Sequence, residues 1–375
     1  MTTSISVDPA TDTGFFGHPR GLFVCFATEL WERFSFYGMK YLLLLYLTKY
    51  HLFSDANGLD VLGSYAALVY ATPVIGGLLA DRFLGMRKAV IFGGILLVLG
   101  HLGMAVEGEQ ARQVGDEIVR DTGALQVFYF SLALIVVGVG FLKPNISTIV
   151  GRLYADEDPR RDSGFTIFYM GINIGAFTAT LLCGYLGETL GWAYGFGAAG
   201  IGMMFGLVTF IYGQKHLHGH AEPRDPKLLQ EKTAIGIKRE PFIYLSALLG
   251  VAVIWQMLQY HAAVGLTLNL VSLAVLMGLI WFITTQCEPV ERQRMTALVV
   301  LTLSTVVFWA LFEQGAGSMT LFADRVMDRE IFGLTLTAAQ YGSLNSLFIF
   351  LLAPLFAWLW TALGRRGLEP STPVK

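Results

Sequence analysis

Long apolar runs alternate with short polar stretches along the whole chain. Ten of these runs have the length that a helix needs to cross a bilayer, about 20 residues. We expect membrane-spanning helices at 20–47, 62–84, 88–106, 124–150, 164–187, 191–213, 241–260, 264–286, 296–322 and 337–363. The pattern therefore predicts an all-α membrane protein built from helical bundles.

The first predicted helix differs from the others because four charged side chains interrupt it. Glu29, Glu32, Arg33 and Lys40 lie within ELWERFSFYGMK, and the helical repeat places most of them on one face. Each charge would cost roughly 3 kcal/mol near the bilayer centre if it faced lipid. Snorkelling to the helix ends is the alternative, but apolar residues flank the cluster on both sides. We therefore expect the charges to face a wet cavity or buried partners, as binding or proton transfer requires.

Single polar residues in other predicted helices extend this cavity. Lys143 follows a long apolar stretch, and Glu313 lies in FWALFEQGAG. A buried lysine needs a counter-charge or an anionic ligand, so we expect a Lys143–Glu313 pair that works as a proton switch, with a purely structural pair as the alternative. Hydrogen-bonding residues in further predicted helices are Tyr70, Tyr169, Asn173, Tyr341 and Asn345.

Composition agrees with a membrane protein. Apolar residues make up 54% and charged residues 14% of the 375 residues, and the mean hydropathy is +0.57, far from the values of a soluble domain. The net charge of −2 gives no indication of nucleic-acid binding, and three scattered cysteines indicate no disulfide framework. The first 19 residues lack the pattern of a signal peptide.

Two local motifs are expected to carry no chemistry. HLHGH at 216–220 lies in a basic loop, where histidines are more often incidental than metal ligands, so we expect no metal site. GFGAAG at 195–200 matches a dinucleotide-binding glycine pattern, but it lies inside an apolar run with no preceding strand. Close packing of helices explains these glycines better.

Basic residues concentrate in alternate loops, which predicts both chain termini in the cytoplasm. Basic side chains follow the second, fourth and sixth predicted helices, and the longest such loop is 214–240. This loop divides the chain. We expect a cytoplasmic tail at 1–19, a six-helix bundle at 20–213, a cytoplasmic linker at 214–240, an extra helix pair at 241–286 and the start of a second bundle at 287–375.

Several motifs resemble those of the proton-dependent oligopeptide transporters, a branch of the major facilitator superfamily. ELWERFSFYG at 29–38 is similar to the signature E-x-x-E-R-F-x-Y-Y-G. The further matching segments follow in the family's order: GGLLADRFLGMRK at 76–88, GFLKPNIST at 140–148, FYMGINIGAF at 168–177, FWALFEQ at 307–313 and SLNSLFIFLLAPLFAWLW at 343–360. The resemblance covers nearly the whole chain and implies the helical-bundle fold of that superfamily.

Two departures from the family pattern stand out. Phe36 occupies the position where the family usually has the first tyrosine of its pair. The family has twelve core helices, and the resemblance accounts for eight of them here. Four helices of the second bundle, with the family's tenth-helix glutamate and eleventh-helix tryptophan, would be missing. We therefore expect a piece of a longer protein or a naturally short form.

The resemblance implies a transporter and not an enzyme: a proton-coupled symporter that imports di- and tripeptides across the cytoplasmic membrane by alternating access. A peptide is a zwitterion, so its site needs charged poles with neutral hydrogen-bonding groups between them. The substrate-binding residues would be Arg33, Tyr37, Lys40, Tyr70, Lys143, Asn173, Trp309 and Asn345. The proton-coupling residues would be Glu29, Glu32, Arg33, Lys143 and Glu313.

The expected partners are di- and tripeptides, protons and the lipid bilayer, without nucleic acid, metal or any cofactor besides the coupling proton. We expect a monomer. Two alternatives stay open: a transporter of the same fold for another substrate, such as nitrate, an amino acid or a drug, and a non-transporting fragment. No H-E-x-x-H or G-x-S-x-G motif supports an intramembrane hydrolase.

Overall fold

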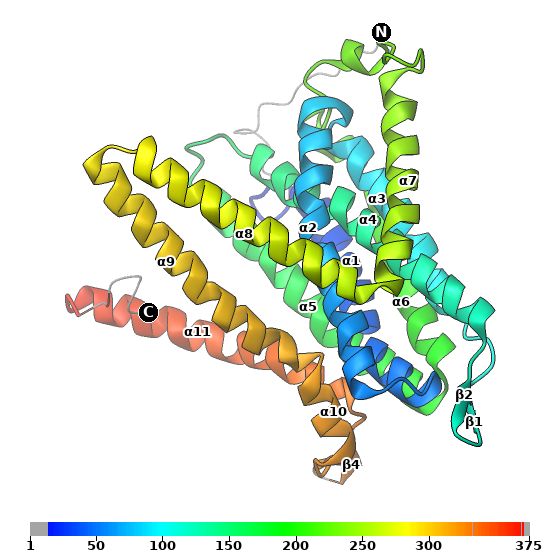
Figure 1. Ribbon diagram of the computed structural model, residues 1–375. Helices are drawn as coiled ribbons and strands as arrows, with labels where there is room; N and C mark the ends of the chain where they lie inside the picture. Colours follow the sequence, from blue (N-terminus) through cyan, green and yellow to red (C-terminus); the bar gives the residue numbers. More distant parts are fainter. Residues whose placement is uncertain (1–13, 332, 369, 371–375) are drawn as a thin grey trace.

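A computed structural model describes residues 14–331, 333–368 and 370, and its main elements are helices (Figure 1). The first six are α1 (Arg20–Leu45), α2 (Asp55–Leu79), α3 (Met86–Met104), α4 (Thr122–Arg152), α5 (Arg161–Thr189) and α6 (Trp192–Gly213). The others are α7 (Arg239–Gln259), α8 (His261–Thr285), α9 (Pro289–Phe312), α10 (Ser318–Arg325) and α11 (Ser343–Arg365).

Short elements connect or extend these helices. The π-helical and 3-10 segments are η1 (Tyr46–Tyr50), η2 (Ala80–Leu84), η3 (Gln214–Leu217), η4 (Pro226–Leu229), η5 (Glu313–Gly315) and η6 (Ala339–Gly342). Two antiparallel hairpins are formed by β1 (Arg112–Val114) with β2 (Glu117–Val119), and by β3 (Glu330–Ile331) with β4 (Leu334–Thr335).

The predicted all-α membrane fold is confirmed. Nine helical segments of the described chain are long and apolar enough to cross a membrane, and the charged α1 is a further helix of 26 residues. The second helix begins at Asp55, earlier than predicted, because the Ser54 side chain caps it by accepting a hydrogen bond from the Asn57 N–H at 3.3 Å. The polar first turns of α2 hid this start from the hydropathy pattern.

The ninth and tenth predicted helices are each divided, which corrects the sequence-based expectation. The helix predicted at 296–322 consists of α9, the 3-10 turn η5 and the short helix α10, with Glu313 at the break. The helix predicted at 337–363 begins with η6, which contains Tyr341, before α11 starts at Ser343. The polar and glycine-rich segment EQGAG explains the first break, because glycine and the lack of apolar residues weaken a helix there.

The first six helices pack into one bundle around α1. This helix contacts α5 and α6 along its length, while α4 packs against α2 and α3. Glycine permits the closest crossings: a Cβ on Gly76 of α2 would lie 2.0 Å from the Gly140 carbonyl oxygen of α4, and a Cβ on Gly175 of α5 would lie 2.3 Å from the Leu30 carbonyl oxygen of α1. These crossings bring four helices together beside the charged residues of α1.

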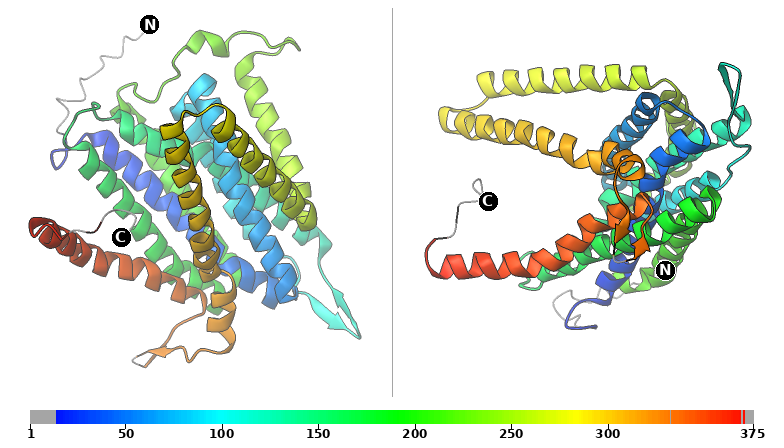
Figure 2. Two further views of the ribbon diagram at one scale, coloured as in Figure 1. Left: turned by 60° about the vertical axis from the view of Figure 1, so that its left-hand side comes forward. Right: turned by 90° about the horizontal axis from the view of Figure 1, so that it is seen from below.

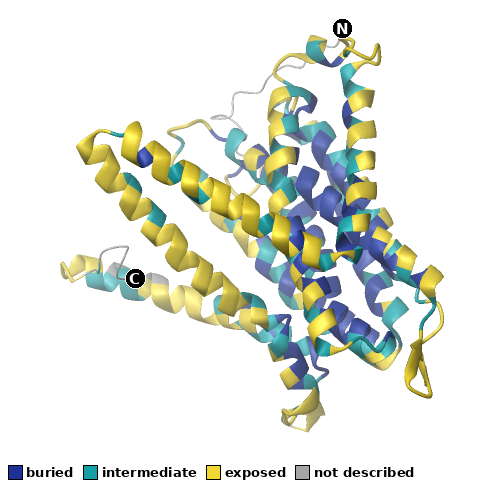
Figure 3. Ribbon diagram, viewed as in Figure 1, coloured by how far each residue is buried: buried dark blue, intermediate teal, exposed yellow. Residues whose placement is uncertain are grey.

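Helices α8, α9 and α11 diverge from this bundle. They meet it at the end where α10 and β4 lie and separate from it toward the end that carries the 214–240 linker (Figures 1 and 2). Their surfaces are largely exposed and apolar (Figure 3). The helices of the chain therefore enclose a wedge that is closed at the end near α10 and open at the opposite end.

Polar contacts hold the closed end together. Arg325 of α10 forms two hydrogen bonds with Asp55 of α2, at 2.6 and 2.8 Å. Lys49 of η1 pairs with Asp324 of α10 and lies 3.8 Å from Glu188 of α5. The Glu188 carboxylate also accepts a hydrogen bond of 2.7 Å from the N–H of residue 339 in η6. We call these contacts the closed-end contacts.

Candidate functional site

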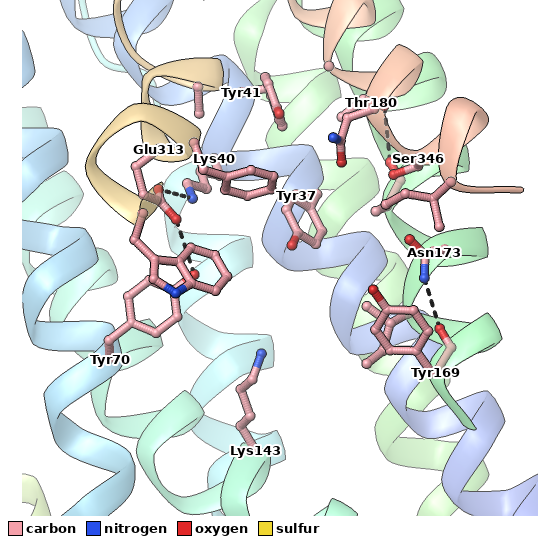
Figure 4. A pocket seen from close by; sticks show the side chains of 18 residues that line it. Tyr37, Lys40, Tyr41, Tyr70, Lys143, Tyr169, Asn173, Thr180, Glu313 and Ser346 are labelled. Atoms are coloured by element: carbon pink, nitrogen blue, oxygen red, sulfur yellow. Dashed lines mark hydrogen bonds and ion pairs between the residues drawn. The ribbon is translucent and has the colours of Figure 1, made fainter. Parts of the chain in front are cut away.

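A cavity of about 270 Å³ lies inside the wedge, between the first bundle and the segments α9, η5 and α11 (Figure 4). We call it the polar cavity. Its lining residues are Tyr37, Lys40, Tyr41, Tyr70, Lys143, Tyr169, Ile172, Asn173, Ala176, Thr180, Trp309, Phe312, Glu313, Ala316, Gly342, Asn345, Ser346 and Ile349. The polar cavity thus combines two lysines, one carboxylate, amides, hydroxyls and aromatic rings.

Seven of the eight predicted substrate-binding residues line the polar cavity. They are Tyr37, Lys40, Tyr70, Lys143, Asn173, Trp309 and Asn345. The predicted proton carrier Glu313 also lines it. Seven elements contribute these side chains, namely α1, α2, α4, α5, α9, η5 and α11, so the fold brings together groups that are far apart in sequence.

Arg33 is the exception, because it is not among the residues that line the polar cavity. Its side chain is buried and forms two hydrogen bonds with the neighbouring Glu32 carboxylate, and its Nε lies 3.4 Å from Glu29 Oε1. Glu29, Glu32 and Arg33 therefore form a buried charge cluster within α1.

The predicted Lys143–Glu313 pair is also wrong for this structure. Glu313 Oε2 lies 2.6 Å from Lys40 Nζ, and Glu313 Oε1 accepts a hydrogen bond of 3.3 Å from the Tyr70 hydroxyl. Lys40 and Glu313 are neighbours because the end of α9 meets α1 near the closed end. Figure 4 shows Lys143 further along the cavity, pointing into it.

Lys143 is the cavity lysine that forms no ion pair with a described residue. Among the described residues, no carboxylate lies within ion-pair distance of its amine and no hydrogen bond to it is formed. A lysine in a confined site is costly to leave unpaired, because burial penalises its charged form. The position is therefore suited to an anionic group of a ligand.

Phe36, the departure from the family signature, packs between cations. Its ring centroid lies 4.7 Å from the Arg33 guanidinium carbon and 5.6 Å from Lys40 Nζ. The ring is buried, and it stacks on Tyr65 at 6.5 Å. A phenyl face attracts both cations through its quadrupole. Phe36 thus connects the buried charge cluster to the Lys40–Glu313 pair without contributing a hydroxyl group.

Sequence reasoning missed several lining residues that follow the helical repeat. On α5, Ala176 and Thr180 extend the face of Tyr169 and Asn173. On α11, Ile349 follows Asn345 by one turn. The i, i+3 and i, i+4 spacing from the predicted residues would have identified them. Phe312 and Tyr41 are sequence neighbours of Glu313 and Lys40, and only the turns of α9 and α1 place them in the lining.

Amide and hydroxyl groups of the first bundle provide the neutral part of the cavity. The Asn173 side chain donates a hydrogen bond of 3.1 Å to the Tyr169 carbonyl oxygen, so its own oxygen is left to accept a hydrogen bond from a ligand. Among the described residues, no three His, Cys, Asp or Glu side chains are grouped as metal ligands. The lining can bind a small zwitterion by charge and hydrogen bonding.

This chain is similar to known membrane transporters. The sequence model of the POT family matches residues 87–375. The uncharacterized transporter YclF of Bacillus subtilis (strain 168) is 41% identical over 372 residues, which cover 96% of this chain and 71% of that protein. The di-/tripeptide transporter of Lactococcus lactis subsp. lactis (strain IL1403) is 36% identical over 385 residues, covering 97% of this chain and 73% of that protein.

Solved structures agree. A crystal structure of the peptide transporter POT in complex with sulfate has a TM-score of 0.79 and 36% sequence identity, and the match covers 98% of this chain and 74% of that one. A POT family transporter in complex with 5-aminolevulinic acid has a TM-score of 0.77 and 29% identity, covering 96% and 73%. From its motifs, its fold and these similarities, the chain belongs to the POT family of membrane transporters.

Proposed function

We propose that this protein imports di- and tripeptides across the cytoplasmic membrane together with protons. The observation that carries the proposal is the polar cavity, in which the unpaired Lys143 faces amides, hydroxyls and aromatic rings. Peptide transporters among the relatives support the same substrate class. A confined site with one free cation and neutral hydrogen-bonding groups fits a short peptide, whose carboxylate must be recognised along with its backbone.

In the proposed binding mode, Lys143 holds the peptide carboxylate. Asn173 of α5 and Asn345 of α11, on two helices that pack against each other, are placed to hydrogen-bond the peptide backbone or amine, with Tyr37 and Tyr70 between the poles. Trp309 and Phe312 offer apolar surface for side chains. Backbone groups are common to all peptides, so contacts of this kind favour peptides as a class over one particular sequence.

The Lys40–Glu313 pair is the proposed proton switch, in place of the Lys143–Glu313 pair expected from the sequence. Protonating Glu313 removes its negative charge and therefore its ion pair with Lys40. This pair joins α1 to the end of α9, near the closed-end contacts. Its loss would weaken the closed end and shift the population toward a state that is open there, which links proton binding to alternating access.

The buried charge cluster is a second proposed proton site. Glu29 Oε2 has no hydrogen-bond partner in the described structure, although the residue is buried. An unsatisfied carboxylate oxygen in such a place is costly, and a proton relieves the cost. Glu32 is held by Arg33 and would exchange its proton only when that pair opens.

The distribution of charged residues supports an orientation with both termini in the cytoplasm. The 214–240 linker, with its lysines and arginines, lies at the same end as the start of α1, and the two hairpins lie at the opposite end (Figure 1). Basic loops remain on the cytoplasmic side. Residues 1–13 of the proposed cytoplasmic tail and residues 371–375 lie outside the described structure. We propose a monomer that needs no cofactor besides the coupling proton.

Uptake by proteoliposomes tests the proposal. We expect the full-length protein to accumulate a labelled dipeptide when the outside is acidic relative to the inside, and an ionophore that collapses the proton gradient to abolish accumulation. Unlabelled di- and tripeptides should compete, whereas nitrate and free amino acids should not. Equal accumulation with and without the gradient would refute the coupling, and competition by nitrate or amino acids alone would refute the substrate class.

A further inference from the structure

A second cavity, of about 240 Å³, lies between α2, α4 and α7, apart from the polar cavity. We call it the α7 groove. Its walls include Ile75 and Leu79 of α2, Val137 and Phe141 of α4, and Gly250 and Ile254 of α7. These helices are all membrane-spanning segments. The groove is therefore an apolar crevice within the thickness of the bilayer.

Glycine keeps the α7 groove open. A Cβ built on Gly250 would have no other atom within 4 Å, so free space lies directly beside the α7 backbone. On the opposite wall, Gly76 and Gly140 let α2 and α4 approach closely and leave no side chain to fill the space. The Thr72 hydroxyl in the lining already donates a hydrogen bond of 3.0 Å to the Val136 carbonyl oxygen. The groove thus favours an apolar occupant.

A cation lies at one end of the groove. Arg82 is three residues beyond the groove residue Leu79, in the π-helical turn η2 that continues α2 toward the linker. It is exposed, and it forms no ion pair or hydrogen bond with any described residue; its guanidinium lies 5.6 Å from the Phe83 ring centroid. This end of α2 is the one near the linker, where α7 also begins. An anionic headgroup at the membrane surface would meet Arg82 there.

We propose that the α7 groove is a lipid site that binds one acyl chain of an anionic phospholipid, with its phosphate beside Arg82. The groove is too small for a helix, and it lies between membrane-spanning helices. An acyl chain of the surrounding lipid is therefore the occupant that can fill it. The bound chain would bridge α7 to the first bundle and strengthen the attachment of the helix pair α7 and α8. This inference does not depend on which substrate the polar cavity takes.

Native mass spectrometry of the delipidated protein in detergent tests the site, with dioleoyl phosphatidylglycerol as the probe. Gly250→Leu fills the groove and should weaken binding of one phosphatidylglycerol by about tenfold or more, because several methylene groups of the chain lose their buried position. Gly278→Leu is the matched control: Gly278, on exposed α8, also has no atom within 4 Å of a Cβ, but it lies outside the groove. It should bind like the parent protein.

The headgroup is tested separately. Arg82→Gln should remove the preference for phosphatidylglycerol over phosphatidylcholine while leaving phosphatidylcholine binding unchanged. Thermal unfolding of every variant checks the fold, and Ser246→Leu replaces Gly250→Leu as the groove-filling variant if the latter unfolds early. Equal phosphatidylglycerol binding by the groove-filling and control variants would overturn the site. An unchanged lipid preference in Arg82→Gln would overturn the assignment of the phosphate.

Discussion

The two lysines of the polar cavity have different partners, and this difference separates their proposed roles. Lys40 is 5% exposed and paired with Glu313, whereas Lys143 forms no ion pair with any described residue. Both residues are cations in apolar helices, and the sequence does not show which of them pairs with Glu313. Substitutions should distinguish the switch from the ligand-binding cation.

Glu313→Gln keeps the shape of the side chain and removes the charge that holds Lys40. We expect this variant to exchange labelled for unlabelled dipeptide across the membrane, but to lose accumulation driven by the proton gradient. Glu313→Asp keeps the charge and should retain part of the coupling. Proteoliposome uptake and exchange assays measure both activities, and gradient-driven accumulation by Glu313→Gln at the parent rate would contradict the switch.

Lys143→Ala should weaken dipeptide binding by about 10- to 100-fold, the range expected for loss of one charge-assisted hydrogen bond. The parent protein should prefer a dipeptide over the same dipeptide with an amidated C-terminus, and the variant should lose this preference. Competition binding with the two ligands gives the result. A variant that still distinguishes the carboxylate from the amide would show that another group binds it.

The burial of His51, which lies outside the spanning helices, predicts how the stability of the protein depends on pH. Its ring is fully buried among Tyr46, Tyr50 and Phe128, and neither ring nitrogen has a hydrogen-bond partner. Burial, together with the nearby Arg120, lowers the pKa of His51 from 6.5 to about 4, and Asp121 opposes this only in part.

The unfolded chain binds a proton at His51 more readily than the folded chain, so protonation favours unfolding. The contribution of neutral His51 to the free energy of unfolding is therefore complete above pH 6.5 and is lost as the pH falls toward 4. We expect His51→Phe, which keeps an aromatic ring and removes the titration, to flatten the pH dependence of the unfolding temperature in this range. An equally steep dependence in the variant would assign the effect to other groups.

At the scale of elements, the polar cavity depends on where α9 ends. This helix ends at Phe312, and the short helix α10 follows after the turn η5. The break at η5 turns Glu313 toward α1, and α10 then reaches the closed-end contacts with Asp55 and Lys49. A continuous helix through this region, as the hydropathy pattern suggests, would carry Glu313 and α10 along one straight axis. The break therefore joins the proposed proton switch to the closed end.

Removing the closed-end contacts should open that end. Each exposed ion pair contributes roughly 1 kcal/mol or less, so we combine Asp324→Asn with Arg325→Gln to shift the population severalfold. Spin labels at Asn57 of α2 and Met319 of α10 should then report a longer distance component. Arg112→Gln, which removes the exposed pair with Glu109 on the β1–β2 side, is the control and should leave the distances unchanged.

At the scale of the whole molecule, the alternation of basic loops and hairpins predicts the topology. The test uses a Cys287→Ser background. There we expect Ile235→Cys, in the linker, to react with a membrane-impermeant thiol reagent only after the cells are opened. Asp116→Cys, between β1 and β2, should react in intact cells. The reverse pattern would invert the proposed orientation, and both Cys25 and Cys183 are buried and serve as an internal background.

The sequence by itself determined the helices and much of the site. Apolar runs of membrane length predict ten helices because hydrocarbon requires backbone hydrogen bonds to be satisfied within each segment, and this local rule needs no tertiary information. The same reasoning marks Glu29, Glu32, Arg33, Lys40, Lys143 and Glu313, since isolated charges in such segments are costly unless they have a function.

Only the tertiary structure decided which of these charges meet. Lys40 pairs with Glu313, and Arg33 pairs with Glu32 and does not line the cavity, because crossing helices and the break after α9 set their neighbours. Pairing across 273 positions of the chain depends on distances between helices, which hydropathy and helical periodicity do not encode. The same holds for the α7 groove, since the space beside Gly250 exists only where three helices come together.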